Sequence, residues 1–272
     1  CVFLLSGEMR VIVASKADPT SIEIAKRIIE IHGFQEIGPD LYRRREILLK
    51  LIEEKHIYRD GLCEELNPEL AIVASAHKSE AGIRALLTHP VGNWGNEAAA
   101  GGRPRTLSPT SAAALYTSLH ALQKQASELK LDEWRVGLEV THHGPATKTP
   151  LIFVEAGGPP DELPEEKALE AVAQACVEVA ESRLSAPDAA IGFGGGHYAP
   201  SFTRLALNGE YALGHMCPKY AMPVDREMII QALEKTVEKP RIAVLDWKGL
   251  KSDMRRELIN VLEDLSVEWI RA

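Results

Sequence analysis

The chain has 272 residues, 45% hydrophobic and 26% charged, which is the size and composition of one large globular α/β domain. Its 31 Lys and Arg against 39 Asp and Glu give a formal net charge of −8, which excludes a surface that is basic throughout but leaves room for a local RNA-binding patch. No apolar run approaches the roughly 20 residues of a membrane helix. The four cysteines form no CxxC pair, so a reducing cytoplasm is expected.

Residues 1–8 precede a natural start at Met9. They lack a basic leader, and their apolar part is shorter than the ~7–15 residues of a signal peptide. We therefore expect 1–8 to be a non-native or dispensable extension and 9–272 to form one α/β catalytic domain. Asn67-Pro68 marks the one candidate lobe boundary, near 67–70.

Apolar β-type runs alternate with helical patterns along the chain. Helices are predicted where caps agree with periodicity, at 19–32, 109–129, 165–184, 224–237 and 252–264. Strands are predicted at 10–15, 46–52, 70–76, 84–88, 135–141, 151–156, 188–193, 211–216, 241–246 and 266–270. This alternation predicts a three-layer α/β/α fold with a mostly parallel or mixed sheet covered on both faces. Segment 90–108 shows neither the helical nor the strand periodicity of apolar residues. It is also too long for a simple connection, which favours a functional loop.

Histidine repeatedly ends an apolar run next to glycine or proline. In open parallel sheets ligands bind outside the carboxyl ends of strands, where six of the nine histidines are predicted to fall. Imidazole is the commonest zinc ligand, so we predict a site for Zn2+, of one or two ions. The candidate metal ligands are His77, His89, His142, His215 and Glu155. No local motif such as HExxH fixes the ligands, and the alternative is that single imidazoles orient substrate or satisfy buried carbonyls.

Catalytic roles are predicted for side chains beside these ligands. Adjacent side chains of an extended segment point to opposite sides, so we expect His142 to bind metal and His143 to act on substrate. Glu139 could hold an imidazole tautomer or act as a general base, and His197 and Lys219 complete the catalytic set. The alternative for Glu139 is a surface strand glutamate.

Glycines and basic clusters are the candidate substrate contacts. Gly194, Gly195 and Gly196 could present backbone N–H groups to a phosphate or a developing oxyanion, and Tyr198 could stack on a base. Three basic clusters could follow a phosphate backbone, although such runs are usually solvated faces. They are Arg43 to Arg45, Arg103 with Arg105 near Trp94, and Lys248 with Lys251, Arg255 and Arg256.

Five motifs in order resemble one family. They are THxxGNWG at 88–95, THHGP at 141–145, GGGHYAP at 194–200, GHxxPKYA at 214–221 and DWKG at 246–249. Together they resemble the archaeal and plant type of D-aminoacyl-tRNA deacylase, over nearly the whole chain from Met9. The resemblance implies hydrolysis of the ester between a D-amino acid and the 3′ end of tRNA, zinc dependence, and a fold related to peptidyl-tRNA hydrolases and phosphorylases.

The resemblance agrees with the residue-level interpretation, because such an ester needs an activated water, an oxyanion stabiliser and a basic surface. It implies aminoacyl-tRNA as the partner, and we infer no obligate protein partner and no membrane. Two alternatives remain. A zinc-dependent amidase or peptidase would not need the arginine clusters or the Trp94 loop, and a non-catalytic RNA-binding protein would gain little from strand-end histidines.

Overall fold

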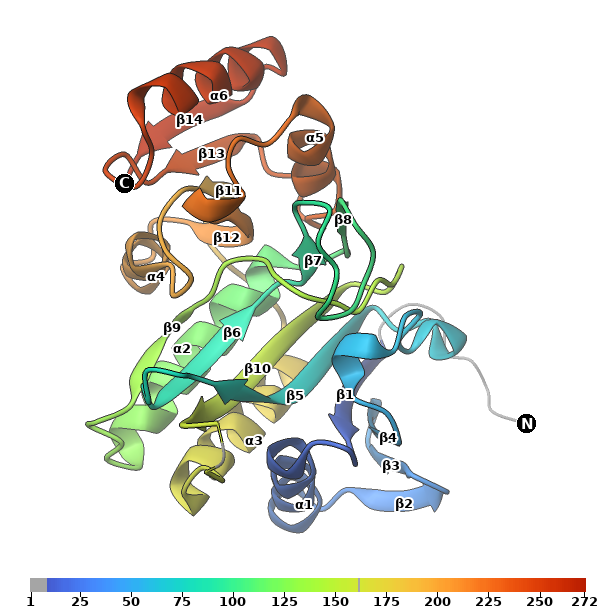
Figure 1. The fold of residues 1–272 in the computed structure, drawn as a ribbon. Helices are drawn as coiled ribbons and strands as arrows, with labels where there is room; N and C mark the ends of the chain where they lie inside the picture. The colour runs from blue at the N-terminus through green and yellow to red at the C-terminus, as the bar shows by residue number, and fades with distance from the viewer. Residues whose placement is uncertain (1–8, 161) are drawn as a thin grey trace.

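The computed structural model describes residues 9–160 and 162–272. The extension predicted at 1–8 lies outside these residues. Within them the chain builds a large sheet, a smaller sheet beside it and a short two-stranded pair between the two (Figure 1). The α/β fold with mixed sheets is therefore confirmed.

The large sheet has the strand order β2-β3-β4-β1-β5-β10-β6-β9. Its middle strands β4, β1, β5 and β10 run parallel, whereas β6 is antiparallel to β10 and parallel to β9. The strands are β1 (Arg10–Ser15), β2 (Gln35–Gly38), β3 (Leu41–Arg44), β4 (Ile47–Ile52), β5 (Leu70–Lys78), β6 (Ala85–His89), β9 (Arg135–Leu138) and β10 (Leu151–Gly158).

Three helices cover one face of this sheet: α1 (Pro19–His32), α2 (Ala112–Glu128) and α3 (Glu166–Glu181). Helix α1 begins where Asp18 accepts hydrogen bonds from two backbone N–H groups of its first turn, and it ends at Gly33, whose φ is 68°. Helix α3 buries mostly alanine and valine, and it packs between α1 and α2. In Figure 1, α2 and α3 lie behind the strands.

The opposite face of the large sheet is covered by irregular chain. Its apolar part packs against the segment that contains the short 3-10 helices η1 (His56–Tyr58) and η2 (Glu64–Leu66). On the same face the middle strands turn polar, with buried Ser75, His77, His89 and Glu155. A folded core gains nothing from such groups unless they are paired, so this face is where a functional site is to be sought.

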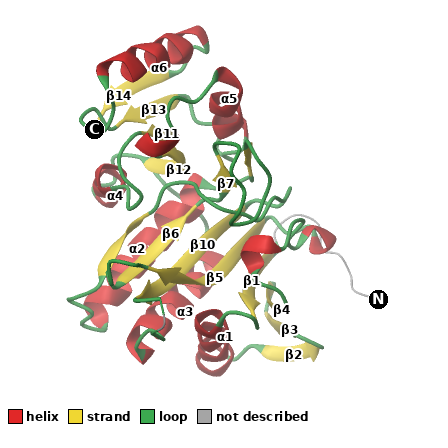
Figure 2. Ribbon diagram, in the orientation of Figure 1, coloured by secondary structure: helices red, strands yellow, loops and turns green. Residues whose placement is uncertain are grey.

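The smaller sheet is entirely parallel, in the order β12-β11-β13-β14. Helix α4 packs on one of its faces and helices α5 and α6 pack on the other (Figure 2). The elements are β11 (Ala189–Phe193), α4 (Pro200–Leu207), β12 (Ala212–Cys217), η3 (Lys219–Ala221), α5 (Arg226–Glu234), β13 (Ile242–Leu245), α6 (Ser252–Asp264) and β14 (Glu268–Arg271). Helix α2 contacts strands of both sheets and so joins them.

Most predicted elements are confirmed within a few residues, and the differences have identifiable causes. The hairpin β2–β3 was missed because its residues are exposed or half-buried and its sequence does not alternate between apolar and polar residues. Helix α4 was missed because it has only eight residues and follows the glycine run directly. The predicted strand 135–141 ends at Leu138, where the chain leaves the sheet edge. The predicted loop 90–108 contains the pair β7 (Gly92–Asn93) and β8 (Thr106–Leu107).

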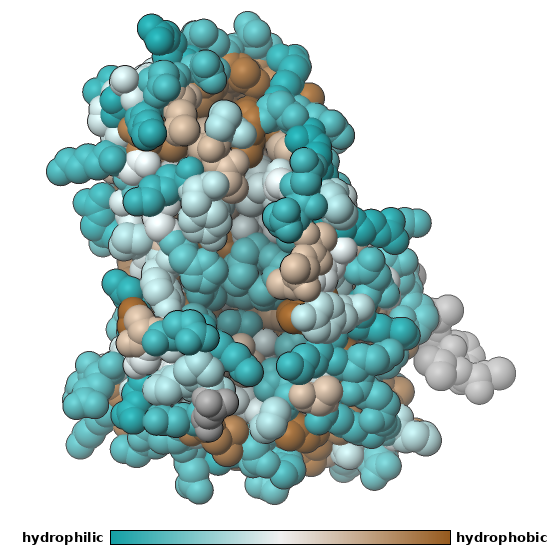
Figure 3. Space-filling model, in the orientation of Figure 1, coloured by the Kyte–Doolittle hydropathy of each residue, from teal (hydrophilic) through white to brown (hydrophobic). Residues whose placement is uncertain are grey.

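The domain division stays a prediction. The candidate boundary near 67–70 falls before β5, which pairs with β1 inside the large sheet. Among the described residues, no helix combines the length and the apolarity that crossing a bilayer requires. The cysteines there, Cys63, Cys176 and Cys217, are buried and free. On the face shown in Figure 3, hydrophilic residues cover most of the surface and hydrophobic ones are scattered.

Gly157 lets β5 and β10 approach closely. A Cβ atom there would lie 1.7 Å from the backbone oxygen of His77, whereas at Gly158 it would meet only the flexible Arg84 side chain, at 3.2 Å. We predict that Gly157→Ala lowers the free energy of unfolding by about 1–3 kcal/mol, the usual cost of overpacking. Urea denaturation measures this, with Gly158→Ala as the matched control; equal losses in the two variants would contradict the argument.

Candidate metal and active site

The site is built around residues 139–143, which follow β9. The Glu139 N–H donates to Thr88 O of the large sheet at 3.1 Å, and the Thr141 N–H donates to Met216 O of the smaller sheet at 2.9 Å. Gly92 N donates to His143 O at 2.8 Å from the 90–108 loop. The segment is therefore held by both sheets and by the loop, which fixes the directions of its side chains.

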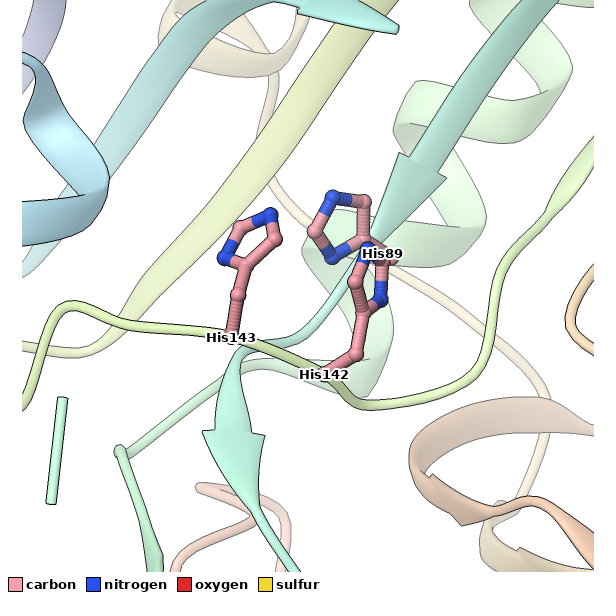
Figure 4. Close-up of side chains that lie close together, drawn as sticks. All are labelled: His89, His142 and His143. Atoms are coloured by element: carbon pink, nitrogen blue, oxygen red, sulfur yellow. The ribbon is translucent and has the colours of Figure 1, made fainter. Parts of the chain in front are cut away.

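Three imidazoles converge above the large sheet: His89, His142 and His143 (Figure 4). Each has its Nδ1 beside a nearby backbone carbonyl, at 3.0 Å for Pro90 O, 2.8 Å for Val140 O and 2.6 Å for Gly144 O. An Nδ1–H that donates to a carbonyl leaves the Nε2 lone pair free, which is the arrangement of metal-binding histidines. The expectation that His142 and His143 point to opposite sides is wrong. His143 has a φ of 45°, so the backbone is not extended, and the two rings lie 4.4 Å apart.

Two carboxylates lie under these rings. Glu139 is fully buried, and its Oε1 lies 3.5 Å from His77 Nδ1 and its Oε2 3.9 Å from His89 Nε2. Glu155, from β10, places Oε1 3.6 Å from His89 Nε2 and Oε2 4.0 Å from His77 Nδ1. Neither oxygen of Glu139 has a hydrogen-bond partner among the described residues, and neither does His89 Nε2. Buried lone pairs without partners are costly, and a metal cation bound here would satisfy them.

The pKa shifts differ among the members of the cluster. Burial, together with the charges of neighbouring histidines, holds the pKa values of His142 and His143 well below the ordinary value. Burial also lowers the pKa of His89, but the nearby carboxylates of Glu155 and Glu139 outweigh it and the pKa is raised overall. For Glu139, burial raises the pKa, and His197, His89 and His77 outweigh it, so the pKa is lowered. These pKa shifts favour neutral His142 and His143 beside an ionised Glu139, the forms that ligate metal.

The donor set fits a metal ion. Three overlapping groups have ligand atoms within 4.8 Å of one another: His89, His142 and His143; Glu139, His142 and His197; and His77, Glu139 and Glu155. Mixed nitrogen and carboxylate oxygen donors suit transition metals such as zinc rather than calcium or magnesium. These buried side chains could therefore hold a metal ion.

His197 forms the open side of the cluster. Its side chain is 37% exposed, whereas that of Glu139 is fully buried. His197 Nε2 lies 2.9 Å from Glu139 Oε1, without the alignment of a hydrogen bond, and Nδ1 lies 3.2 Å from the Tyr220 hydroxyl. The preceding glycines turn the chain, with φ values of 102° at Gly194 and 75° at Gly195. The His197 carbonyl accepts from Val140 N at 3.0 Å, which ties this loop to the 139–143 segment.

A cavity of about 310 Å3 opens onto the cluster. Its lining includes His77, His142, His143, His197 and Glu155, and it extends to Asp18 and His56. Sequence analysis missed the last two. In the sequence, the helix-capping role of Asp18 gave no reason to assign it to a site. His56 lies 3.6 Å from Asp18, and no sequence pattern marked it as a site residue. Tyr198 lies next to His77 of this lining: its hydroxyl is 3.2 Å from His77 Nε2, and the Arg135 guanidinium lies over its ring.

The site histidines lie at or just after the carboxyl ends of their strands, as predicted, but these ends do not share one edge of the large sheet. Because β6 is antiparallel to β10, His89 at its end lies level with Phe153, while His77 lies level with Gly157. Glu155 stands between them on the same face. The histidines therefore converge across the face of the sheet.

Two predicted site residues lie apart from the cluster. His215 is buried beside Thr141 Oγ1, with its ring edge-on to Trp94, and burial lowers its pKa to about 3. Lys219 begins η3, and its backbone N–H donates to Gly195 O at 3.0 Å.

The predicted RNA contacts lie elsewhere on the structure. Trp94 packs against Phe193, and the arginines near it are paired with acids: Arg105 with Asp225 and Glu227, and Arg103 with Asp60. Lys248 follows β13.

The fold and this buried cluster of imidazoles and carboxylates define a class, that of α/β enzymes with a metal-compatible hydrolytic site. Comparison with known proteins then gives the family. A family model described as D-aminoacyl-tRNA deacylase matches residues 64–270. A D-aminoacyl-tRNA deacylase of Thermococcus kodakarensis is 35% identical over 97% of this chain and 100% of the relative, and one of Pyrococcus horikoshii is 36% identical with the same coverage. The chain belongs to the D-aminoacyl-tRNA deacylase family, and it is a hydrolase.

A solved structure supports the fold. The crystal structure of a conserved protein of unknown function superposes with a TM-score of 0.89 at 26% identity, and the match covers 97% of this chain and 95% of the other. The arrangement of two sheets described above is therefore shared with an experimental structure.

We predict that Glu139→Gln weakens metal binding by at least ~10–100-fold, because the variant loses a carboxylate that can ligate or orient the metal. Competition against a chromophoric zinc chelator measures the affinity. Glu128→Gln, at the end of α2, is the control and should leave the affinity unchanged. Equal zinc affinity in Glu139→Gln and the control would contradict a metal at this cluster.

Proposed function

We propose that this protein hydrolyses the ester bond between a D-amino acid and the 3′ end of tRNA, with zinc as its metal. The single observation that supports this most is the buried Glu139, which has no hydrogen-bond partner among the described residues although imidazoles surround it, in a chain of the D-aminoacyl-tRNA deacylase family. The cavity beside it supports access for a substrate.

His89, His142 and His143 would hold zinc through their free Nε2 atoms, and Glu139, His77 and Glu155 offer a second, adjacent donor group. When bound, zinc lowers the pKa of a coordinated water and polarises a carbonyl oxygen. The number of ions is left open by this arrangement. His215 is set aside as a ligand because it belongs to none of the three donor groups.

His197 is proposed as the general base and acid. Its side chain is 37% exposed, and its Nε2 lies 2.9 Å from Glu139 Oε1, a position that suits proton transfer between a substrate and the cluster. His197 takes a proton from the attacking water as the new carbon–oxygen bond forms. It then returns that proton to the ribose 3′ oxygen as the ester bond breaks, giving the free amino acid and tRNA. Lys219 and His143 are left without a direct proton-transfer role.

The glycine loop is proposed to stabilise the developing oxyanion. The Gly194 N–H already donates to Cys217 O at 2.8 Å, which removes it from the predicted set. Within the described part of the chain, the N–H groups of Gly195 and Gly196 have no hydrogen-bond acceptor. They precede His197 directly, so their donors would face the same reacting group. Tyr198, beside His77, is proposed to position the terminal nucleotide.

The function is tested by a deacylation time course on matched D- and L-tyrosyl-tRNA. We predict release of D-tyrosine in large excess over L-tyrosine, loss of activity after dialysis against a chelator, and recovery with zinc. A peptide panel run in parallel tests the amidase or peptidase alternative. Full activity in demonstrably metal-free protein would contradict the zinc proposal, and cleavage of peptides but not of the ester would contradict the substrate.

The role of His197 is tested by substitution. Because its side chain lies at the cavity mouth and not in the core, His197→Ala should fold normally and lower kcat by at least ~100-fold, the usual range for a general acid or base. His32→Ala, at the far end of α1, is the histidine control. A well-folded His197→Ala variant with near-normal kcat would refute the assignment.

A further inference from the structure

The protein has a net charge of −8, so its RNA substrate needs a basic surface that is not neutralised locally. Two of the three basic clusters in the sequence are compensated by acids. Arg43 pairs with Glu46, and Arg44 and Arg45 pair with Glu181. Arg103 and Arg105 pair with acids of η1–η2 and α5 as described above.

The remaining cluster differs in this respect. From the sequence cluster it keeps Lys248, Lys251 and Arg255 but not Arg256, and the structure adds Trp247, Trp269 and Arg271 beside them. We name these six residues the cation–tryptophan cluster. Among the residues that the structure describes, none of its four cations has a carboxylate within the 4.0 Å of an ion pair, whereas the cations of the other two clusters do. The lysines and Arg271 are exposed. Its positive charge is therefore available to a partner.

The aromatic rings of this cluster order its arginines. Trp247 and Trp269 are stacked, with centroids 6.2 Å apart and an angle of 9° between the rings. The Arg271 guanidinium lies 3.8 Å from the Trp247 centroid and that of Arg255 lies 4.3 Å from it. Arg255 also donates to Trp247 O at 2.6 Å. Stacked guanidinium and indole planes are the surfaces on which unpaired RNA bases stack.

The cluster adjoins the active site. Asp246 N donates to Phe193 O at 2.9 Å, and a Cβ atom at Gly249 would lie 2.6 Å from Gly195 N. Ser201 at the start of α4 donates to Asp246 Oδ2 at 3.2 Å. The loop that bears Lys248 is thus packed on the glycine loop that bears His197, so RNA leaving the cavity over that loop reaches the cluster.

We propose that the cation–tryptophan cluster binds the acceptor end of the substrate tRNA. Lys248 and Lys251 contact phosphates, and the Trp247–Arg271 stack presents a plane to a base near the 3′ end. This rests on the proposed function, since it assumes that RNA occupies the cavity. It also moves the principal RNA surface from the Arg103–Arg105 loop to the end of the smaller sheet.

The test measures the binding of uncharged tRNA to the intact protein across a KCl series. Lys248→Ala/Lys251→Ala should weaken binding by about 10-fold or more and reduce the salt slope by roughly 1.8, from two lost contacts at ~0.9 each. The matched control is Lys26→Ala/Lys124→Ala, which removes two exposed lysines from α1 and α2. Equal affinities and slopes in the two double variants would overturn the proposal.

A second measurement reports on stacking. Trp94 and Trp134 are buried, so added tRNA should quench mainly Trp247 and Trp269. Trp247→Phe keeps an aromatic ring and should lose most of the quench, and an undiminished quench would overturn the stacking role. Wild-type protein that binds tRNA through the cluster but leaves D-aminoacyl esters intact would contradict the proposed function while supporting this surface.

Discussion

Everything at the site depends on one buried carboxylate without a hydrogen-bond partner. Glu139 is fully buried, and the backbone around it is bonded to both sheets, so its carboxylate is held away from solvent. A charge in that position is tolerated only with a compensating cation. His77, His89 and His197 converge on its two oxygens, and a metal ion bound among these side chains would supply that cation. Stability and function are therefore coupled at this residue.

Each of the two sheets contributes a different part of the site. The large sheet supplies the donors buried on the face opposite its helices, from β5, β6 and β10. The smaller sheet supplies the glycine loop with His197 and, next to it, the loop after β13. Helix α2 contacts both sheets, so the distance between the buried donors and the exposed histidine is set by packing on one rigid element. A substrate that reaches the cavity is held between parts that do not have to assemble first.

Sequence reasoning reached the residue types of the site but not its geometry. Caps such as Asp18-Pro19 and the period of 165–184 are local signals, so those helices were predictable. The strand reversal at β6 is a tertiary pairing that no local pattern encodes, and it moved the site from a sheet edge to a sheet face. The left-handed backbone of His143 could not be predicted either, since positive φ is uncommon for any residue other than glycine. His215 met every sequence criterion for a ligand, yet the fold places it against Thr141 and Trp94.

The carbonyls beside the three imidazole Nδ1 atoms belong to residues one or two positions away in the chain: Pro90, Val140 and Gly144. Each ring is thus aligned by its own stretch of backbone and not by a distant partner. The tautomer and orientation of each ring are therefore set by a short peptide segment. The tertiary fold has only to bring three oriented rings together. Little rotational freedom then remains to be lost when a ligand arrives, so affinity at this centre is governed by the spacing of the segments rather than by the mobility of the side chains.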